Sequence, residues 1–258
     1  MDKIKHKILV LSGKGGVGKS TVSSQLALYL SHIGKKVGLL DIDLCGPSIP
    51  KMLGVENKEV HKSSSGWIPV YRDETQNLGV ISIQFLLDKS DTPVIWRGPK
   101  KNSMIKQFIE DVCWGELDYL IIDTPPGTSD EHISVTEALL KHNPDGAILV
   151  TTPQAVSVSD VRKEISFCKL LGLPIIGIVE NMSGYVCPHC SECTNIFSSE
   201  GGKLLAEQTN IPFLGKLPID PYLTACSEKG VNYFKEYPNS STLSALKTFV
   251  ETFEQQNK

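Results

Sequence analysis

The sequence predicts an α/β fold in which helices cover both faces of a doubly wound, mainly parallel sheet. Five short runs of apolar residues show no alternation with polar ones, which is typical of strands buried on both faces. Helical periodicity follows two of these runs, and strand–helix–strand units of this kind pair their strands in parallel with right-handed crossovers. The five runs lie at residues 8–11, 37–40, 120–122, 147–150 and 175–179.

Three helices are expected from apolar residues that recur at helical spacing. The first ends before Gly34, because glycine is a common helix stop. The third is a C-terminal helix at about residues 240–255. Residues 56–77 fit neither pattern, and we expect them to leave the sheet. The apolar faces comprise Val22, Leu26, Leu30 and Ile33 in the first helix, Val158, Val161, Ile165, Cys168 and Leu171 in the second, and Leu243, Leu246, Phe249, Val250 and Phe253 in the third.

The composition is that of a globular protein. Hydrophobic residues account for 40% of the 258 positions and charged residues for 21%, which excludes a disordered or collagen-like chain. No change in composition and no long linker divides the chain, so we expect a single domain over residues 1–258. The net charge of −3 lacks the basic field of a general nucleic-acid binder, so we expect no nucleic-acid partner.

Nothing in the sequence predicts export or membrane insertion. The apolar run at residues 8–11 is too short for a signal peptide, and no stretch approaches the roughly 18 apolar residues of a membrane span. We therefore expect a cytoplasmic, reducing environment. In such a compartment clustered cysteines favour metal or redox chemistry over structural disulfides.

A glycine-rich segment with the pattern of a phosphate-binding loop follows the first expected strand and opens the first expected helix. Its glycines allow backbone N–H groups to converge on phosphate oxygens, and the helix N-terminus adds a favourable dipole. In this pattern Lys19 reaches the β- and γ-phosphates and Ser20 ligates Mg²⁺. The expected nucleotide-binding residues of the loop are Gly13, Lys14, Gly15, Gly16, Val17, Gly18, Lys19, Ser20 and Thr21.

Carboxylates end two of the expected strands. Asp41 and Asp43 follow one apolar run, and Asp123 follows another. Carboxylates at the C-terminal ends of parallel strands face the ligand crevice of such a sheet. We expect Asp123 to hold Mg²⁺ through water and residues 124–127 to sense the γ-phosphate. Asp41 is the weaker candidate, since a strand-end carboxylate also serves as a structural hydrogen-bond acceptor.

The additional lysine of the loop, Lys14, resembles the deviant Walker A motif of the class that includes MinD, ParA and the nitrogenase iron protein. The resemblance implies that Lys14 reaches across a dimer interface to the partner's nucleotide and that Asp43 orients or activates the attacking water. It also implies ATP as the nucleotide, with Asn181 and Asp220 flanking the adenine. Either of these two residues is equally a turn former.

Three of the seven cysteines lie together at residues 187–193. Cys187 and Cys190 form a C-x-x-C motif, which directs two thiolates at one metal centre. A four-coordinate zinc or [4Fe–4S] site needs four ligands, and two chains meeting at a twofold axis would supply these two cysteines twice. A zinc site within one chain, with Cys193 and either His189 or water, and a redox dithiol are the alternatives. The other cysteines are scattered, and Cys113, Cys168 and Cys226 are expected to be packing residues, with Cys168 on a helix face and Cys45 beside the Asp43 loop.

These motifs together resemble the Mrp/ApbC family of iron–sulfur cluster carriers and scaffolds, and within it the short form of the eukaryotic cytosolic members. A bacterial or archaeal member is a close second. The motifs are the phosphate loop, residues 41–48 (DIDLCGPS), 123–127 (DTPPG), 180–184 (ENMSG) and 187–190 (CPHC).

The family resemblance implies a labile [4Fe–4S] cluster held between two subunits by Cys187 and Cys190 and passed to apo-proteins. ATP and Mg²⁺ would gate assembly or release, with slow hydrolysis that depends on Lys14, Lys19 and Asp43. The resemblance also implies a homodimer, or pairing with a long family member that carries a cysteine-rich extension.

Other functions use the same phosphate loop. A MinD/ParA-type positioning ATPase would need a membrane or DNA surface, and the C-terminal helix lacks the basic polar face that anionic lipid requires. A reductase like the nitrogenase iron protein takes its cluster ligands from widely separated cysteines. A small-molecule kinase would need a substrate-binding signature that the sequence does not display.

Overall fold

The computed structural model of the chain describes residues 1, 3–43, 46–64, 66–86, 98–127, 130–186 and 193–257, without the side chains of residues 98–102, 130, 131 and 193. Among these residues, eight strands form one sheet in the order β12-β9-β8-β1-β7-β2-β6-β5. All neighbours are parallel except β5 and β6. The strands are β1 (Ile4–Leu11), β2 (Val37–Asp41), β5 (Val70–Tyr71), β6 (Leu78–Ser82), β7 (Leu117–Asp123), β8 (Gly146–Thr151), β9 (Ile175–Glu180) and β12 (Phe213–Lys216).

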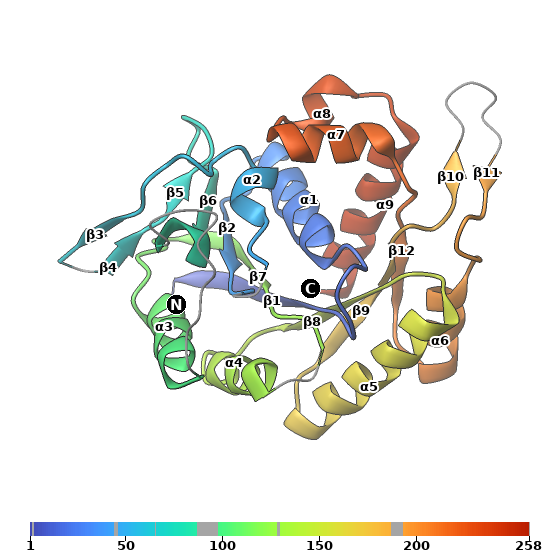
Figure 1. Cartoon of the computed structure of the whole chain (residues 1–258), viewed down its shortest axis with the longest axis horizontal. Coiled ribbons are helices and arrows are strands. Elements are labelled where there is room, and N and C mark those ends of the chain that lie inside the picture. Colours follow the sequence, from blue (N-terminus) through green and yellow to red (C-terminus); the bar gives the residue numbers. More distant parts are fainter. Residues whose placement is uncertain are drawn as a thin grey trace.

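Helices cover both faces of this sheet (Figure 1), so the expected doubly wound α/β fold is confirmed. One face carries α1 (Lys19–His32), α2 (Ile49–Met52), α7 (Pro221–Lys229), α8 (Tyr233–Glu236) and α9 (Ser241–Gln256). The other face carries α3 (Gly98–Glu110), α4 (Asp130–Leu140), α5 (Ala155–Leu171) and α6 (Gly201–Thr209). A short 3₁₀ turn, η1 (Ile83–Leu86), follows β6. Each layer encloses its own apolar core against the sheet.

The five apolar runs all lie within strands of the sheet, and the central strands β1, β2, β7 and β8 are almost entirely buried at the predicted positions. Side chains of these strands alternate between the two cores, which explains why their sequences are apolar without interruption. Because the strands are parallel, their C-terminal ends meet at one edge of the sheet.

The first helix ends one residue earlier than its apolar pattern suggested. Ile33 was expected on the buried face, but 44% of its surface is exposed, because the helix ends at His32. Gly34 follows with a φ of +88°, and Lys35 N–H donates to the Leu30 carbonyl oxygen. This left-handed glycine turn confirms Gly34 as the helix stop.

Residues 56–77 leave the sheet only in part. β3 (His61–Ser63) and β4 (Gly66–Ile68) form a separate antiparallel pair that projects from the left side of Figure 1. The chain then returns as β5, which pairs antiparallel with β6 at the edge of the main sheet. The expectation that all of residues 56–77 leave the sheet is therefore wrong for Val70, which lies in β5 with its side chain buried in the core.

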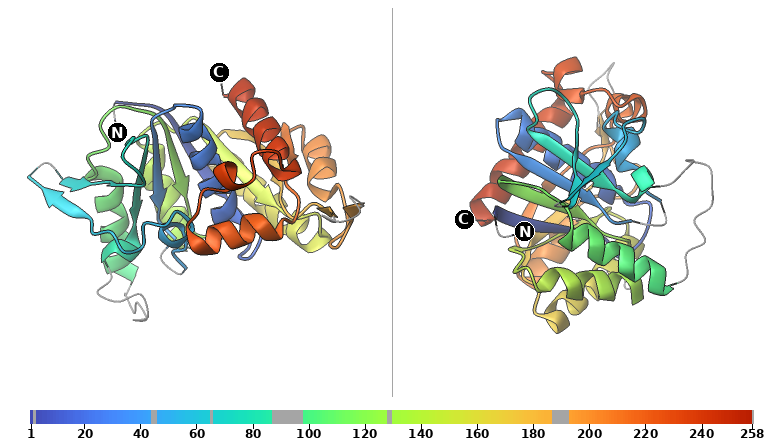
Figure 2. Two further views of the ribbon diagram at one scale, coloured as in Figure 1. Left: turned by 90° about the horizontal axis from the view of Figure 1, so that it is seen from above. Right: turned by 90° about the vertical axis from the view of Figure 1, so that its left-hand side faces the viewer.

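The C-terminal helix α9 packs on the sheet face that also carries α1. Its apolar residues Leu246, Phe249, Val250 and Phe253 are buried completely. The chain ends lie on the same side of the molecule (Figure 2), where Asn257 Nδ2 is 3.2 Å from His6 Nδ1. None of the helices within the described ranges combines the length and apolar character needed to span a bilayer.

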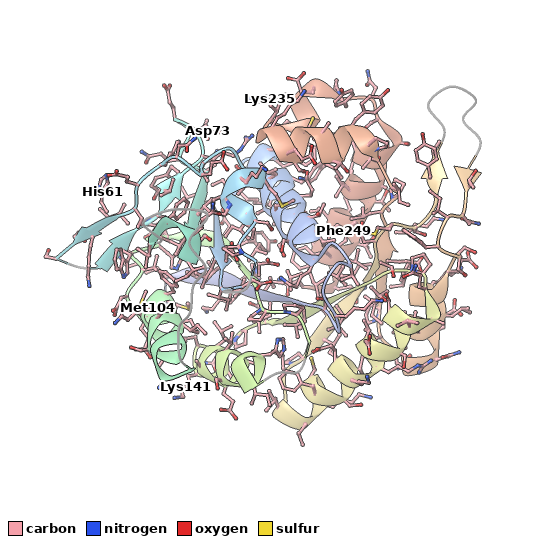
Figure 3. The ribbon with its side chains drawn as sticks, viewed as in Figure 1. His61, Asp73, Met104, Lys141, Lys235 and Phe249 are labelled. Atoms are coloured by element: carbon pink, nitrogen blue, oxygen red, sulfur yellow. The ribbon has the colours of Figure 1, made fainter. Side chains whose placement is uncertain are left out.

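We predict that Phe249→Ala lowers the free energy of unfolding by about 3–5 kcal/mol, because it leaves a cavity between α9 and the sheet. Figure 3 shows Phe249 in the interior, and its side chain is fully buried. Chemical denaturation followed by circular dichroism measures the loss. The matched control is Lys247→Ala on the exposed side of the same helix, which should change stability by less than about 0.5 kcal/mol. Equal stability of the two variants would contradict the packing described for α9.

Candidate functional site

The phosphate loop connects β1 to α1 and is held by close backbone contacts on two sides. A Cβ atom at Gly13 would lie 2.5 Å from the carbonyl carbon of Asp160 in α5, so only glycine fits there. Gly18 has a φ of +82°, and a Cβ atom there would lie 2.1 Å from Asn181 Nδ2. These two glycines allow the loop to approach α5 and the end of β9 while curling around a cavity.

The loop lines a cavity of about 270 Å³ at the C-terminal edge of the sheet. The predicted residues Lys14, Gly15, Gly16, Val17, Gly18, Lys19, Ser20, Thr21 and Asp43 all border it, whereas Gly13 shapes the loop from behind. The α1 N-terminus opens into the same space, so backbone N–H groups and the helix dipole favour an anion there. The cavity therefore has the shape and chemistry of a phosphate site.

Lys19 and Asp123 form a buried ion pair beside this cavity. Lys19 Nζ lies 2.9 Å from Asp123 Oδ1. Ser20 Oγ donates a hydrogen bond to Asp123 Oδ2 at 2.7 Å, and Ser23 Oγ donates one to Oδ1 at 2.6 Å. The structure thus brings together the predicted residues Lys19, Ser20 and Asp123. Ser23 was missed, although its position one helical turn after Ser20 was a usable signal.

The two carboxylates after β2 have different surroundings. Asp41 is buried, accepts hydrogen bonds from Ser82 Oγ at 2.8 Å and from the Asp43 N–H at 3.2 Å, and pairs in register with Asp123. Burial and the nearby Asp123 charge raise the pKa of Asp41 to about 8. These contacts fit the structural alternative that made Asp41 the weaker candidate for a catalytic role. Asp43 borders the phosphate cavity, with Oδ2 4.0 Å from Lys19 Nζ.

The side chains around the cavity fit a nucleotide with its magnesium ion. Lys19 Nζ is buried, and apart from its ion pairs it has no hydrogen-bond partner among the described residues, so a phosphate oxygen would supply one. The Ser20 hydroxyl and the Asp123 carboxylate lie within one hydrogen bond of each other. Magnesium typically uses one or two protein oxygens and takes the rest from phosphates and water. An incomplete protein ligand set is therefore what such a site requires.

A second cavity, of about 540 Å³, continues from the first. Thr21, Ser48 and Met52 border both. Asn181 and Asp220, the two residues predicted to flank a base, both line the second cavity. Asn181 is buried, and its Nδ2 donates to the Val17 carbonyl oxygen at 2.9 Å. Asn181 therefore connects the second cavity directly to the phosphate loop.

Asp220 uses its carboxylate for a structural role. It is the N-cap of α7, where Oδ1 accepts hydrogen bonds from the N–H groups of Tyr222 at 2.8 Å and Leu223 at 3.2 Å. Its Oδ2 accepts from the Tyr233 hydroxyl and from Thr242 Oγ1. This cap ties α7 to α8 and α9, which is the turn-forming alternative for Asp220. Contact between Asp220 and a base stays a prediction.

A buried acid–base pair supports the loop after Asp123. His132 Nδ1 lies 2.9 Å from the Pro125 carbonyl oxygen, and Nε2 lies 3.7 Å from Glu164 Oε2. Neither carboxyl oxygen of Glu164 has a hydrogen-bond partner within the described part of the chain. Burial raises the pKa of Glu164 to about 8 and lowers the pKa of His132. Neither residue could be predicted from the sequence, because no local pattern relates α4 to α5.

The predicted cluster ligands Cys187 and Cys190 lie outside the described residues, as does Cys45. In the described ranges, no group of three or more His, Cys, Asp or Glu residues is placed to hold a metal ion. Cys168 and Cys226 are buried, as expected for packing residues, and burial raises the pKa of both thiols, that of Cys168 to about 12. Cys113 is half-buried.

Comparison with known families and relatives gives matches along nearly the whole chain. The family described as ParA, NUBPL iron-transfer P-loop NTPase, matches residues 3–254. A Dictyostelium discoideum protein named cytosolic Fe-S cluster assembly factor NUBP2 homolog is 84% identical over 253 residues, which cover 98% of this chain and 96% of the relative. The Gallus gallus cytosolic Fe-S cluster assembly factor NUBP2 is 62% identical over 94% of this chain and 89% of its own length.

Solved structures with the same fold include nucleotide complexes. The nucleotide-binding protein of Archaeoglobus fulgidus in complex with ADP is 42% identical, with a TM-score of 0.78 over 89% of this chain and 88% of its own. The septum site-determining protein MinD of Pyrococcus horikoshii, complexed with Mg-ADP, has a TM-score of 0.72 over 96% of this chain and 95% of its own. At 23% identity, MinD supports the fold alone.

We predict that Glu164→Gln stabilises the protein increasingly as the pH rises from 5 to 8. The folded state raises the pKa of Glu164, so the stability present when the carboxyl is protonated is lost as the pH rises toward about 8. The difference in unfolding free energy between variant and wild type should grow by at most about 1.4 kcal/mol per pH unit, as measured by urea titrations.

The control is Glu137→Gln, at an exposed position of α4. Its difference from wild type should not change with pH. His132 is common to all three chains, so its own titration largely cancels in these differences. A flat difference for Glu164→Gln would contradict the buried, proton-holding carboxyl.

Proposed function

The chain belongs to the ParA family of NUBPL iron-transfer P-loop NTPases, and on that premise we propose that it assembles an iron–sulfur cluster and transfers it to apo-proteins under the control of a bound nucleotide. The observation that carries the proposal is the position of β10 (Tyr185–Val186) and β11 (Cys193–Thr194). These strands flank the C-x-x-C motif and pair with each other, and Tyr185 bridges to Ile219, which lines the larger cavity. The names of the relatives as Fe-S cluster assembly factors support the same function.

The nucleotide in this proposal is ATP with Mg²⁺. The backbone of residues 13–21 would hold the phosphates, Lys19 would bind the β- and γ-phosphates, and Ser20 and Asp123 would hold the magnesium ion. When bound, ATP supplies the phosphoryl group whose hydrolysis distinguishes two states of the protein. The Ser20–Asp123 hydrogen bond keeps both oxygen ligands on one side of the cavity before the ion arrives.

Hydrolysis would depend on two further groups. Asp43 borders the phosphate cavity with its Oδ2 4.0 Å from Lys19 Nζ, and it would orient or activate the attacking water. Lys14 would enter the partner's site and stabilise negative charge that develops on the phosphates. The side chain of Lys14 is half-buried at the rim of the cavity, a position from which a lysine can reach outward. A monomer, whose site lacks the partner's lysine, would therefore hydrolyse ATP slowly.

The cargo would be a labile [4Fe–4S] cluster bound by Cys187 and Cys190 from each of two subunits. The two buried thiols, Cys168 and Cys226, are poor ligands because their raised pKa values keep them protonated. We propose a homodimer or a heteromer with a longer, cysteine-extended family member, acting in the cytosol as the names of the relatives indicate.

A membrane-positioning role is disfavoured by α9. The residues that would contact lipid, including Leu246, Phe249 and Phe253, are buried against the sheet. An amphipathic helix whose apolar face is already packed cannot bury that face in a bilayer without unfolding from the core.

We predict that anaerobic reconstitution with iron and sulfide yields a brown dimer with about four irons per dimer, and that Cys187→Ala/Cys190→Ala loses both colour and iron. Iron analysis with Mössbauer spectroscopy measures the content, and size-exclusion chromatography measures the dimer. The control is Cys113→Ala, which should retain both. Equal iron in the double variant would overturn the ligand assignment, and colourless protein holding zinc would overturn the cargo.

We predict that Lys14→Ala retains ADP binding but loses dimerisation or lowers ATP hydrolysis by about 10²–10³-fold, the usual effect of losing one preorganised charge-stabilising group. Steady-state phosphate release and fluorescence binding distinguish these effects. Lys19→Ala provides the comparison and should lose nucleotide binding itself, while the exposed Lys141→Ala should resemble wild type. Unchanged dimerisation and hydrolysis in Lys14→Ala would refute action across an interface.

A further inference from the structure

The hairpin formed by β10 and β11 stands at the right-hand end of Figure 1, beside β12. Tyr185 pairs with Thr194 and Val186 with Cys193, so the outgoing and returning arms are joined just before and just after residues 187–192. Tyr185 also bridges to Ile219, which lines the larger cavity. Contacts that hold these two arms therefore set the positions of the residues on either side of 187–192.

One buried carboxylate contacts the outgoing arm and the start of the helix that follows the returning arm. Glu180, at the end of β9, is fully buried. Its Oε1 accepts a hydrogen bond from Ser183 Oγ in the outgoing arm, and its Oε2 accepts one from the N–H of Gly202 at the start of α6, each at 2.6 Å. Hydrogen bonds to a carboxylate are about twice as strong as those between neutral groups. Glu180 therefore connects two chain segments that are separated by the whole hairpin.

The next residue along the chain contacts the phosphate loop. Asn181 Nδ2 donates to the Val17 carbonyl oxygen at 2.9 Å, and the Asn181 N–H donates to the Thr151 carbonyl oxygen at 2.8 Å. Gly18 leaves room for this amide. A shift of the loop on nucleotide binding would therefore act on Asn181, and through one peptide unit on Glu180.

Both arms also border the nucleotide site and contain left-handed backbone. Met182, in the outgoing arm, lines the larger cavity with a φ of +56°. In the returning arm, Ile196 and Phe197 line the same cavity, and Ser198 and Glu200 have φ values of +79° and +61°. Non-glycine residues hold such conformations only where surrounding contacts impose them, and they gather at switch regions.

We propose that Glu180 is a positioning residue that couples nucleotide occupancy to the β10–β11 hairpin, because it holds the outgoing arm and the helix after the returning arm against the strand whose end contacts the phosphate loop. The inference rests on the proposed function, because that function assigns cluster binding to the cysteines between the arms. Glu180 contacts neither cavity itself and acts through Ser183, Gly202 and the adjoining Asn181.

The test is hydrogen exchange of the full chain, without iron, in the presence and absence of ADP. In wild type, we expect ADP to slow exchange in peptides that contain residues 185–186 and 193–197. Ser183→Ala removes the brace on the outgoing arm, so this ADP-dependent protection should fall by about tenfold, the effect of one lost hydrogen bond to a charged group. The affinity for ADP should change by less than about twofold, because the phosphate contacts remain.

Matched variants keep the result decisive. Glu180→Ala removes both hydrogen bonds and should abolish the ADP-dependent protection. If Glu180→Ala does not fold, the result for Ser183→Ala alone tests the proposal. Ser244→Ala, on the exposed side of α9, should behave as wild type. A merely structural defect would speed exchange equally with and without ADP. Such an equal increase would overturn the proposal. So would full ADP-dependent protection in Ser183→Ala, and so would the absence of ADP-dependent protection in wild type.

A second readout separates this proposal from the proposed function. In reconstituted protein, the rate of iron loss to a chelator should depend on ADP in wild type and Ser244→Ala, and this dependence should disappear in Ser183→Ala. Failure of the wild type to take up iron and sulfide would overturn the cluster function while leaving the exchange result, which needs no cluster, to decide the role of Glu180. Equal nucleotide dependence of iron loss in Ser183→Ala and wild type would overturn the coupling.

Discussion

The buried ion pair between Lys19 and Asp123 is the interaction on which the rest of the site depends. Either charge alone in this interior would cost several kcal/mol, and Ser20 and Ser23 complete the hydrogen bonds of the carboxylate. Because Lys19 begins α1 and Asp123 ends β7, the pair fixes the phosphate loop against the centre of the sheet. In the proposed function, a phosphate entering the cavity would compete for the Lys19 ammonium, and the released Asp123 carboxylate would become available to a magnesium ion.

The features that could be predicted from the sequence are those that a local pattern of residues specifies. The central strands carry apolar runs because both of their faces are covered. β12 was missed because only two of its four residues, Phe213 and Leu214, are apolar, and β6 was missed although its apolar content equals that of β2. Lys19, Ser20 and Asp123 belong to local motifs and were found. Ser82 was not assigned, because its partner Asp41 lies 41 residues away and only the register of β2 with β6 brings them together. Ser23 lies outside the loop motif and was missed, although it follows Ser20 by one helical turn. Asp220 was ambiguous because a helix cap and a ligand contact use the same residue type.

The buried side chains of His132 and Glu164, beneath the loop that follows Asp123, are governed by the cost of burying a charge. His132 and Glu164 approach each other from α4 and α5 under the loop that follows Asp123. A carboxyl buried without hydrogen bonds is stable mainly in its protonated form, which is why its pKa rises to about 8. A neutral Glu164 adds no charge beneath the loop. The same principle applies to the cysteines. Burial raises the pKa of the Cys168 and Cys226 thiols and keeps them protonated, so these two are poor metal ligands.

The end of β9 gives a physical reason why the proposed nucleotide and cysteine sites could influence each other. Successive side chains of an extended chain point to opposite faces of a sheet. Asn181 is accordingly directed at the phosphate loop, on the face that carries α1, while Glu180 is directed at α6 on the other face. A movement of this strand end by a fraction of an ångström would be felt on both faces at once, because each side chain is buried and hydrogen-bonded. Packed interiors do not absorb such shifts gradually. A single peptide unit can therefore serve two sites without a separate hinge.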